Sequence, residues 1–224
     1  MRFSVENRPT KEGLLEYVWR TFNRLKSVID GISFRVDGDL WDDETAAIAN
    51  GTPTPSPALL ANFGPGGVQV QEYVFNQGDS MYIRFPIKHQ IKPGSKVYIY
   101  IRWSTDGSGA GNVAWKFTWL EAKGHGQEAF AQAATSPLIV VGAAHATPWW
   151  HHVTEASDVQ AMDAPEVDSV LLMEVERGAA GDGDTYTNAG NGHVFGLYVS
   201  LHYIKDRLGT TQKAPDFYAG GQKV

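Results

Sequence analysis

The spacing of apolar residues changes once along the chain, and the change separates a helical start from a long β region. Near the N-terminus, apolar residues recur at alternating spacings of three and four, which places them on one face of a helix. This apolar stripe consists of Leu15, Val18, Phe22, Leu25 and Ile29. Thr10 can cap the N-terminus of this helix, and Gly31 can end it because glycine readily takes the left-handed backbone conformation. Residues 1–31 are therefore predicted to form an arm and one amphipathic helix.

The apolar stripe requires a surface to cover it, and the sequence leaves two interpretations open. The helix packs either on the β domain of its own chain or on another subunit. It is only about two heptads long, which is too short for a stable coiled coil on its own. Its place ahead of a polar connection favours a device for attachment or assembly.

Residues 32–67 show neither helical nor strand periodicity and are predicted to be an extended linker. Three prolines alternate with Thr and Ser between residues 52 and 57, which excludes a helix there. An acidic patch precedes them at Asp37, Asp39, Asp42, Asp43 and Glu44.

From residue 68 the apolar period becomes two, which is typical of β-strands. The clearest strand covers residues 96–103, where Val97, Ile99, Ile101 and Trp103 share one face. Tyr98 and Tyr100 lie on the opposite face. The next strand carries Trp115, Phe117 and Trp119 on one face, and the two strands are predicted to form a hairpin.

About eight strands are predicted in residues 68–204. They cover residues 68–73, 81–87, 96–103, 115–119, 138–141, 149–154, 169–176 and 194–204. Without helical crossovers the sheets must be antiparallel, so a jelly-roll-like sandwich is predicted. The Gly-rich loop 178–192 is expected to be mobile, and residues 205–224 to form a polar tail.

The amino-acid composition excludes several classes of protein and of binding partner. The 224 residues include seven Trp, nine Tyr, ten Phe and no Cys, with a formal net charge of -6. The absence of Cys excludes a disulfide scaffold and a thiolate metal site. The acidic balance argues against direct binding of nucleic acid or anionic membrane. No apolar run reaches the length of a membrane span, and no secretory signal is recognised, so synthesis in the cytoplasm is expected.

No arrangement of polar residues indicates catalysis or a cofactor. His151 and His152 are adjacent, so on a strand they point to opposite faces and cannot chelate one ion. The acidic patch, and Asp182 with Asp184, lack the spacing of an EF-hand and are predicted to be solvated loops. Glu174 and Glu176 share one strand face, and they are the carboxylate pair to test for glycoside hydrolysis. No nucleophile motif is present, and we predict no enzyme activity, no metal and no cofactor.

Aromatic residues outside the predicted core are the positive signal. Tyr98 and Tyr100 oppose the apolar row of their strand, and Trp149 and Trp150 follow Pro148 directly. Aromatic side chains on both faces of a sheet indicate that both faces are covered. These four residues are predicted to form a protein interface or, as an alternative, a platform for glycans.

Residues 85–104 and 111–117 resemble a β domain of tailed-phage virion proteins. The resemblance lies in the Pro-Ile-Lys-His of residues 86–89, the Lys-Pro-Gly turn of residues 92–94 and the Gly-Asn-Val-Ala-Trp of residues 111–115. The family carries two His before the Trp of the first strand, where this chain has Tyr100 and Arg102. No role of those His residues is therefore carried over. Residues 8–17 also look like the short anchor openings of phage structural proteins.

The resemblance implies a structural protein of the virion, made in the host cytoplasm. Such a protein would be a homo-oligomer, with a trimer expected, whose partners are capsid or tail subunits. We favour a cement or decoration protein of the head. The alternative is a tail or collar appendage that binds a glycan receptor.

Overall fold

The computed structural model describes residues 16–26, 40–47, 57–66, 70–124, 126–132, 137–163, 165–187 and 192–205. The chain divides into two units, residues 1–39 and residues 40–224. Among the described residues, no helix is long and apolar enough to cross a membrane.

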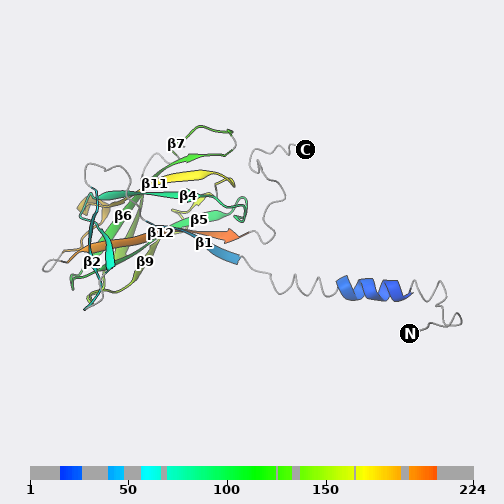
Figure 1. Ribbon diagram of the computed structural model, residues 1–224, viewed down its shortest axis with the longest axis horizontal. Helices are drawn as coiled ribbons and strands as arrows, with labels where there is room; N and C mark the ends of the chain where they lie inside the picture. The colour runs from blue at the N-terminus through cyan, green and yellow to red at the C-terminus, as the bar shows by residue number, and fades with distance from the viewer. Residues whose placement is uncertain are drawn as a thin grey trace. The chain divides into compact units, whose positions relative to one another are not determined.

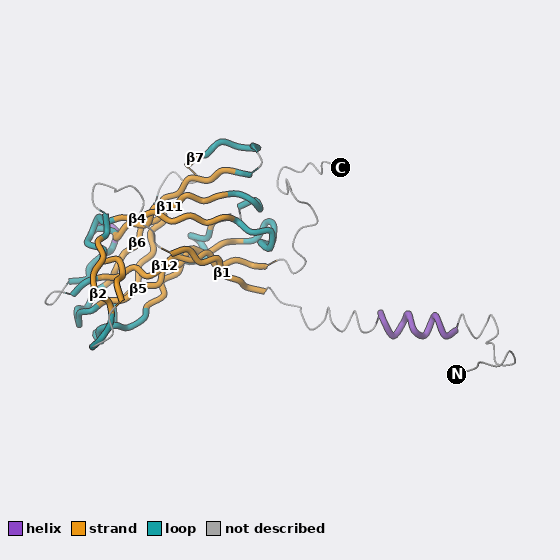
Figure 2. The backbone as a smooth tube through the Cα atoms, in the orientation of Figure 1, coloured by secondary structure: helices purple, strands orange, loops and turns teal. Residues whose placement is uncertain are grey.

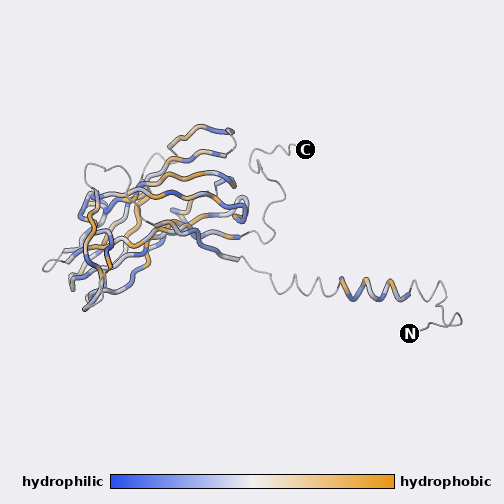
Figure 3. The backbone as a smooth tube through the Cα atoms, in the orientation of Figure 1, coloured by the Kyte–Doolittle hydropathy of each residue, from blue (hydrophilic) through white to orange (hydrophobic). Residues whose placement is uncertain are grey.

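The first unit contains a helix over residues 16–26, as its 3-4 spacing predicts. The Arg20 guanidinium pairs with the Glu16 carboxylate one turn earlier, at 2.5 Å. Val18, Phe22 and Leu25 share the opposite face, and they are 55%, 58% and 56% exposed. Figure 3 shows the resulting alternation of hydrophobic and hydrophilic positions along the helix. The other two residues of the predicted stripe, Leu15 and Ile29, lie outside the described residues.

The second unit is a sandwich of two antiparallel sheets (Figures 1 and 2). Strands β5 (Lys96–Thr105) and β12 (Val194–Lys205) form the centre of sheet A. Two short strands, β9 (His152–Glu155) and β10 (Met162–Asp163), pair with β5. On the other side of β12 lie β1 (Leu40–Ala47) and β3 (Val70–Val74), and β3 pairs with β2 (Leu59–Phe63).

Sheet B is smaller and has β11 (Val170–Arg177) between β4 (Ser80–Pro86) and β6 (Asn112–Ala122). Strands β7 (Ala131–Gln132) and β8 (Leu138–Ala143) pair with the free side of β6. The predicted antiparallel, jelly-roll-like sandwich is confirmed.

The core lies between the sheets and is built by the period-two alternation. Val97, Ile99, Ile101 and Trp103 of β5 are all at most 1% exposed, as the sequence predicts for this face. Sheet B contributes Trp115 and Phe117, among other side chains, and Trp115 meets Phe75 edge to face at 5.2 Å. Edge-to-face contacts of this kind add to the free energy gained by burying the rings.

Three differences from the sequence prediction concern strand pairing. The predicted linker, residues 32–67, contributes strands β1 and β2 to sheet A. The predicted hairpin of β5 and β6 does not exist, because β5 pairs within sheet A and β6 within sheet B. Strands β7 and β10 are two residues long, too short to leave a periodic signal.

The described part of the Gly-rich loop after β11, residues 178–187, is hydrogen-bonded to the sandwich. Arg177 donates from Nε and Nη2 to the two carboxylate oxygens of Asp184, at 2.9 and 3.0 Å. Both side chains are buried. The same carboxylate accepts hydrogen bonds from the Ala114 N–H and from the side-chain amide of Gln77. A short 3-10 turn, η2 (Ala180–Asp182), lies within this loop.

Candidate functional site

The outer face of sheet A is the candidate site, and the strand register assembles it. On β5 the inward row ends at Trp103, so Tyr98, Tyr100 and Arg102 point outward. His202 of β12 lies opposite Tyr98, and Asp43 of β1 lies opposite His202. Three neighbouring strands thus place aromatic and charged side chains on one surface.

Four rings gather at the β1 edge of this face, those of Trp41, Tyr98, Tyr100 and His202. The ring centroids of Trp41 and His202 are 4.6 Å apart, and those of Trp41 and Tyr98 are 5.7 Å apart. Trp41 is 46% exposed. Tyr100 meets His202 edge to face at 6.2 Å but is only 4% exposed. Trp41 is therefore the ring of this group most open to a ligand.

Each of the other three rings is held by a carboxylate. Tyr98 Oη donates to Asp158 at 3.0 Å, and Tyr100 Oη donates to Asp43 at 2.8 Å. His202 Nδ1 lies 2.9 Å from the Glu155 carboxylate. The hydrogen bond to Asp158 raises the pKa of the Tyr98 phenol, because the bond stabilises the protonated form. These bonds fix the rings in one orientation.

Arg102 continues the face along the strands. Its guanidinium carbon lies 5.3 Å from the centroid of the Tyr100 ring and 5.2 Å from that of the Tyr198 ring. Such cation–π contacts are worth about 0.5–2 kcal/mol, depending on exposure. The hydrogen bond to Tyr100 raises the pKa of Arg102.

The far end of the same face is closed by aromatic packing. Phe195 lies in register with Ser104, on the side of the sheet opposite Trp103, and is fully buried. Phe63 of β2 covers it at 5.1 Å, and Trp149 packs against it at 5.9 Å. Trp149 has a φ of 65°, which is rare for a bulky residue, and its N–H donates to the Thr105 carbonyl.

Trp150 has surroundings different from those of its neighbour in sequence. Its ring stacks on His145 at 4.1 Å, and 52% of the residue is exposed. His152 stacks in the same way on Trp103 at 4.1 Å. Burial lowers the pKa of His152, and the neighbouring His145 and His151 lower it further.

The four predicted aromatic site residues therefore do not form one cluster. Tyr98 and Tyr100 lie together on the outer face of sheet A, Trp149 packs at its far end, and Trp150 stacks on His145. The sequence prediction missed Trp41 and His202. A Trp-Asp-Asp-Glu-Thr alternation is present at residues 41–45, but nothing in it indicates that this segment pairs with β12.

The predicted acidic patch is divided among several partners. Asp42 accepts from Lys205 at 2.9 Å, and this bond lowers the pKa of Asp42. Asp43 accepts from Tyr100, and Glu44 pairs with Lys88. Asp37 and Asp39 lie outside the described residues. No group of three or more His, Asp or Glu side chains among the described residues could hold a metal ion.

Glu174 and Glu176, the carboxylate pair nominated for hydrolysis, lie on the outer face of sheet B. Glu174 accepts hydrogen bonds from Ser80 at 2.7 Å and from Thr118 at 3.3 Å. Glu176 pairs with Lys116 at 2.9 Å, and this bond raises the pKa of Lys116. Both carboxylates thus bridge adjacent strands.

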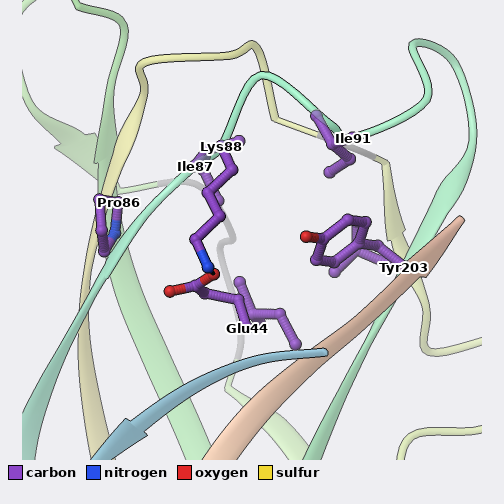
Figure 4. Close-up of a pocket in the computed structure, with 8 residues that line it drawn as sticks. Glu44, Pro86, Ile87, Lys88, Ile91 and Tyr203 are labelled. Atoms are coloured by element: carbon purple, nitrogen blue, oxygen red, sulfur yellow. Dashed lines mark ion pairs between the residues drawn. The ribbon is translucent and has the colours of Figure 1, made fainter. Parts of the chain in front are cut away.

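A small pocket opens at the edge of the sandwich between β1 and the segment after β4 (Figure 4). Lys88 reaches across it to Glu44, and Tyr203 lies on its inner side, facing Ile91. Burial raises the pKa of Tyr203 to about 12. The interior has room for about one water molecule, so it cannot hold an organic ligand.

No family model and no curated protein sequence matches the chain. Two solved structures have a similar fold. One is CBM35 from Cellvibrio japonicus Abf62, at 10% identity and a TM-score of 0.35, covering 75% of this chain and 99% of that one. The other is CBM28, described as a carbohydrate-binding module specific for non-crystalline cellulose, at 11% identity and a TM-score of 0.30, covering 73% of this chain and 85% of that one. Both likenesses concern the fold, and neither bears on what this chain binds.

Proposed function

We propose that this chain is a structural protein of a tailed-phage particle, which attaches through residues 1–31 and presents its β-sandwich. The observation that carries the proposal is the exposed apolar stripe of the helix. Val18, Phe22 and Leu25 face one way and are each more than half exposed. A short amphipathic helix is marginal in water on its own, so covering this stripe with a partner would stabilise it.

The partner that we propose is a capsid subunit, which makes the chain a cement or decoration protein of the head. The protein is expected to be a homo-oligomer, and a trimer is the state that the phage resemblance implies. A non-catalytic role agrees with the positions of Glu174 and Glu176, whose carboxylates are occupied by Ser80, Thr118 and Lys116.

The test measures co-sedimentation of purified protein with particles that lack it. Deletion of residues 1–31 is expected to abolish association. A double variant, Phe22→Ala with Leu25→Ala, is expected to weaken association at least tenfold, because it removes apolar surface and keeps high helix propensity. The matched control is Glu16→Ala with Arg20→Ala on the opposite face of the helix, which is expected to associate normally.

Light scattering gives the oligomeric state of the same samples. A monomer that still binds particles without residues 1–31 would refute the attachment role. Equal loss of association in the two double variants would show that helix content matters and that the apolar stripe has no specific role.

A second candidate function is receptor binding by a tail or collar appendage that recognises a glycan. The outer face of sheet A favours it, because Trp41, Tyr98 and His202 combine ring surfaces with hydrogen-bonding groups. In that case the helix would dock on tail subunits, and the sandwich would point outward.

A further inference from the structure

On the outer face of sheet A, the exposed ring of Trp41 lies beside hydrogen-bonding side chains that are held in fixed orientations. Trp41 is flanked by His202 and Tyr98, with ring centroids 4.6 and 5.7 Å away. The ring planes are tilted by 58° and 60° to that of Trp41, so its neighbours do not stack flat on it. A flat ring surface with both apolar and polar neighbours suits a ligand that is itself amphipathic.

Carboxylates surround these rings with spare acceptor capacity. Asp43, Glu155 and Asp158 each hold one ring through one oxygen. An ionised carboxylate has about four acceptor positions, so each can accept further hydrogen bonds. Arg102 adds a guanidinium with several donors. Acceptors and donors therefore lie within one patch beside an apolar ring.

The patch is organised before any ligand arrives. Most of its side chains come from the adjacent strands β1, β12 and β5, whose register is fixed along the backbone ladder. Glu155 belongs to β9, which pairs with β5, and Asp158 follows that strand. The bonds from Tyr98, Tyr100 and His202 to carboxylates hold the rings further. Side chains already immobilised in the free protein lower the entropic cost of binding.

We propose that this face binds a neutral saccharide, with the apolar face of one pyranose ring lying on Trp41 and its hydroxyl groups bonded to the surrounding carboxylates. The inference rests on the second candidate function and assigns its site and ligand class. Sugar hydroxyls donate to carboxylates and accept from Arg102, which matches both kinds of group in the patch.

The charges of the patch favour this ligand over two others. An acidic saccharide would meet the carboxylates of Asp43, Glu155 and Asp158, and the repulsion would oppose binding. A second protein would have to bury these charges, whereas the centre of a protein interface is depleted in charged residues. Hydroxyl groups satisfy the carboxylates without bringing a net charge.

Trp150 provides a matched control for Trp41. The two residues are similarly exposed, at 52% and 46%, and lie on the same sandwich. Trp150 stacks nearly parallel on His145, with an interplanar angle of 17°, so one of its ring faces is covered. Substituting either residue removes an exposed Trp, but only Trp41 belongs to the proposed site.

The experiment is a fluorescence and calorimetric titration of the full chain. The probes are soluble oligomers of glucose, mannose, galactose and N-acetylglucosamine, with oligogalacturonate as the acidic comparison. The wild-type chain is expected to bind at least one neutral series saturably. Trp41→Ala is expected to weaken that binding at least tenfold, and Trp150→Ala to leave it within twofold. Tyr98→Phe, which keeps the ring and loses the bond to Asp158, is expected to weaken binding by less than Trp41→Ala does.

Several results would overturn the inference. They are absence of saturable binding to every neutral series, tighter binding of oligogalacturonate, or loss of binding in Trp150→Ala and not in Trp41→Ala. Thermal unfolding confirms that each variant is folded, and if Trp41→Ala does not fold, Trp41→Leu takes its place. Particle association is measured on the same variants, so failure to bind saccharide is distinguished from failure of the attachment role.

Discussion

The two outer faces of the sandwich use their charged side chains differently. On sheet B, the Glu174 and Glu176 carboxylates bond to Ser80 and Lys116 on neighbouring strands. On sheet A, carboxylates such as Asp43 bond to aromatic rings. The Glu174 and Glu176 carboxylates of sheet B therefore tie strands to one another, whereas Asp43, Glu155 and Asp158 beside sheet A position rings at a surface. The comparison indicates that substitutions on the sheet B side should change stability, and substitutions on the outer face of sheet A should change binding.

The largest effect on stability is expected at the end of sheet B, where Arg177 meets Asp184. Asp184→Asn leaves the Arg177 charge buried without its partner, because both side chains are inaccessible to water. The expected loss is about 3–5 kcal/mol in the free energy of unfolding. Urea unfolding followed by tryptophan fluorescence measures it, and a loss below about 1 kcal/mol would contradict the structural role of this pair.

The next effect concerns Tyr203, on the inner side of the pocket at the sandwich edge. Its pKa is raised to about 12 in the folded chain, against about 10 when unfolded. Stability from the neutral phenol is therefore fully present below pH 10 and is lost as the pH rises through 12. Wild-type protein is expected to lose about 2 kcal/mol more than Tyr203→Phe over this range. Parallel pH profiles of the two proteins would contradict the burial of this phenol.

A smaller effect is expected at acid pH from His152, which stacks on Trp103. Its pKa is lowered in the folded state, so the unfolded chain binds a proton more readily. The stability that the neutral ring contributes is present above pH 6.5 and is lost as the pH falls through the lowered value. Denaturant unfolding between pH 7.5 and 5 measures the slope. His152→Gln is expected to have a shallower slope than the wild type, and an unchanged slope would assign it to other groups.

The smallest effect on stability is expected from Glu155→Gln on sheet A and Glu176→Gln on sheet B. Both carboxylates are partly exposed, so each substitution should cost less than about 1 kcal/mol. Saccharide affinity separates the two variants: Glu155→Gln should reduce it severalfold and Glu176→Gln should not. The comparison of the two faces would fail if both variants bound equally well.

Period-two alternation was sufficient to predict the strands that form the core. Residues 96–103 and 194–204 were predicted as strands, and they are the centre of sheet A. Alternation does not say which strands pair, so β5 and β6 were predicted as a hairpin although they lie in different sheets. The N-terminal helix was predicted from its 3-4 spacing, which is a local signal.

The candidate site was only partly predictable because it is assembled by long-range pairing. Tyr98 and Tyr100 stand out as aromatic residues on the polar side of a strand. Trp41 and Asp43 lie more than 150 positions from His202, and only the antiparallel register of β1 and β12 brings them together. Strands β1 and β2 were not predicted, because the Pro-rich segment between them gives residues 32–67 the composition of a linker.

The proposed division of roles, attachment by the helix and saccharide binding by the sandwich, can be tested most directly by cryo-electron microscopy of the phage particle in which we propose that the chain resides. We expect density for the helix, residues 16–26, packed through Val18, Phe22 and Leu25 against a neighbouring subunit. We also expect the outer face of sheet A, with Trp41 and Tyr98, to be open to solvent. A map in which that face is buried against a neighbour while the helix stripe remains in solvent would reverse both assigned roles, and a particle without the chain would refute the attachment role.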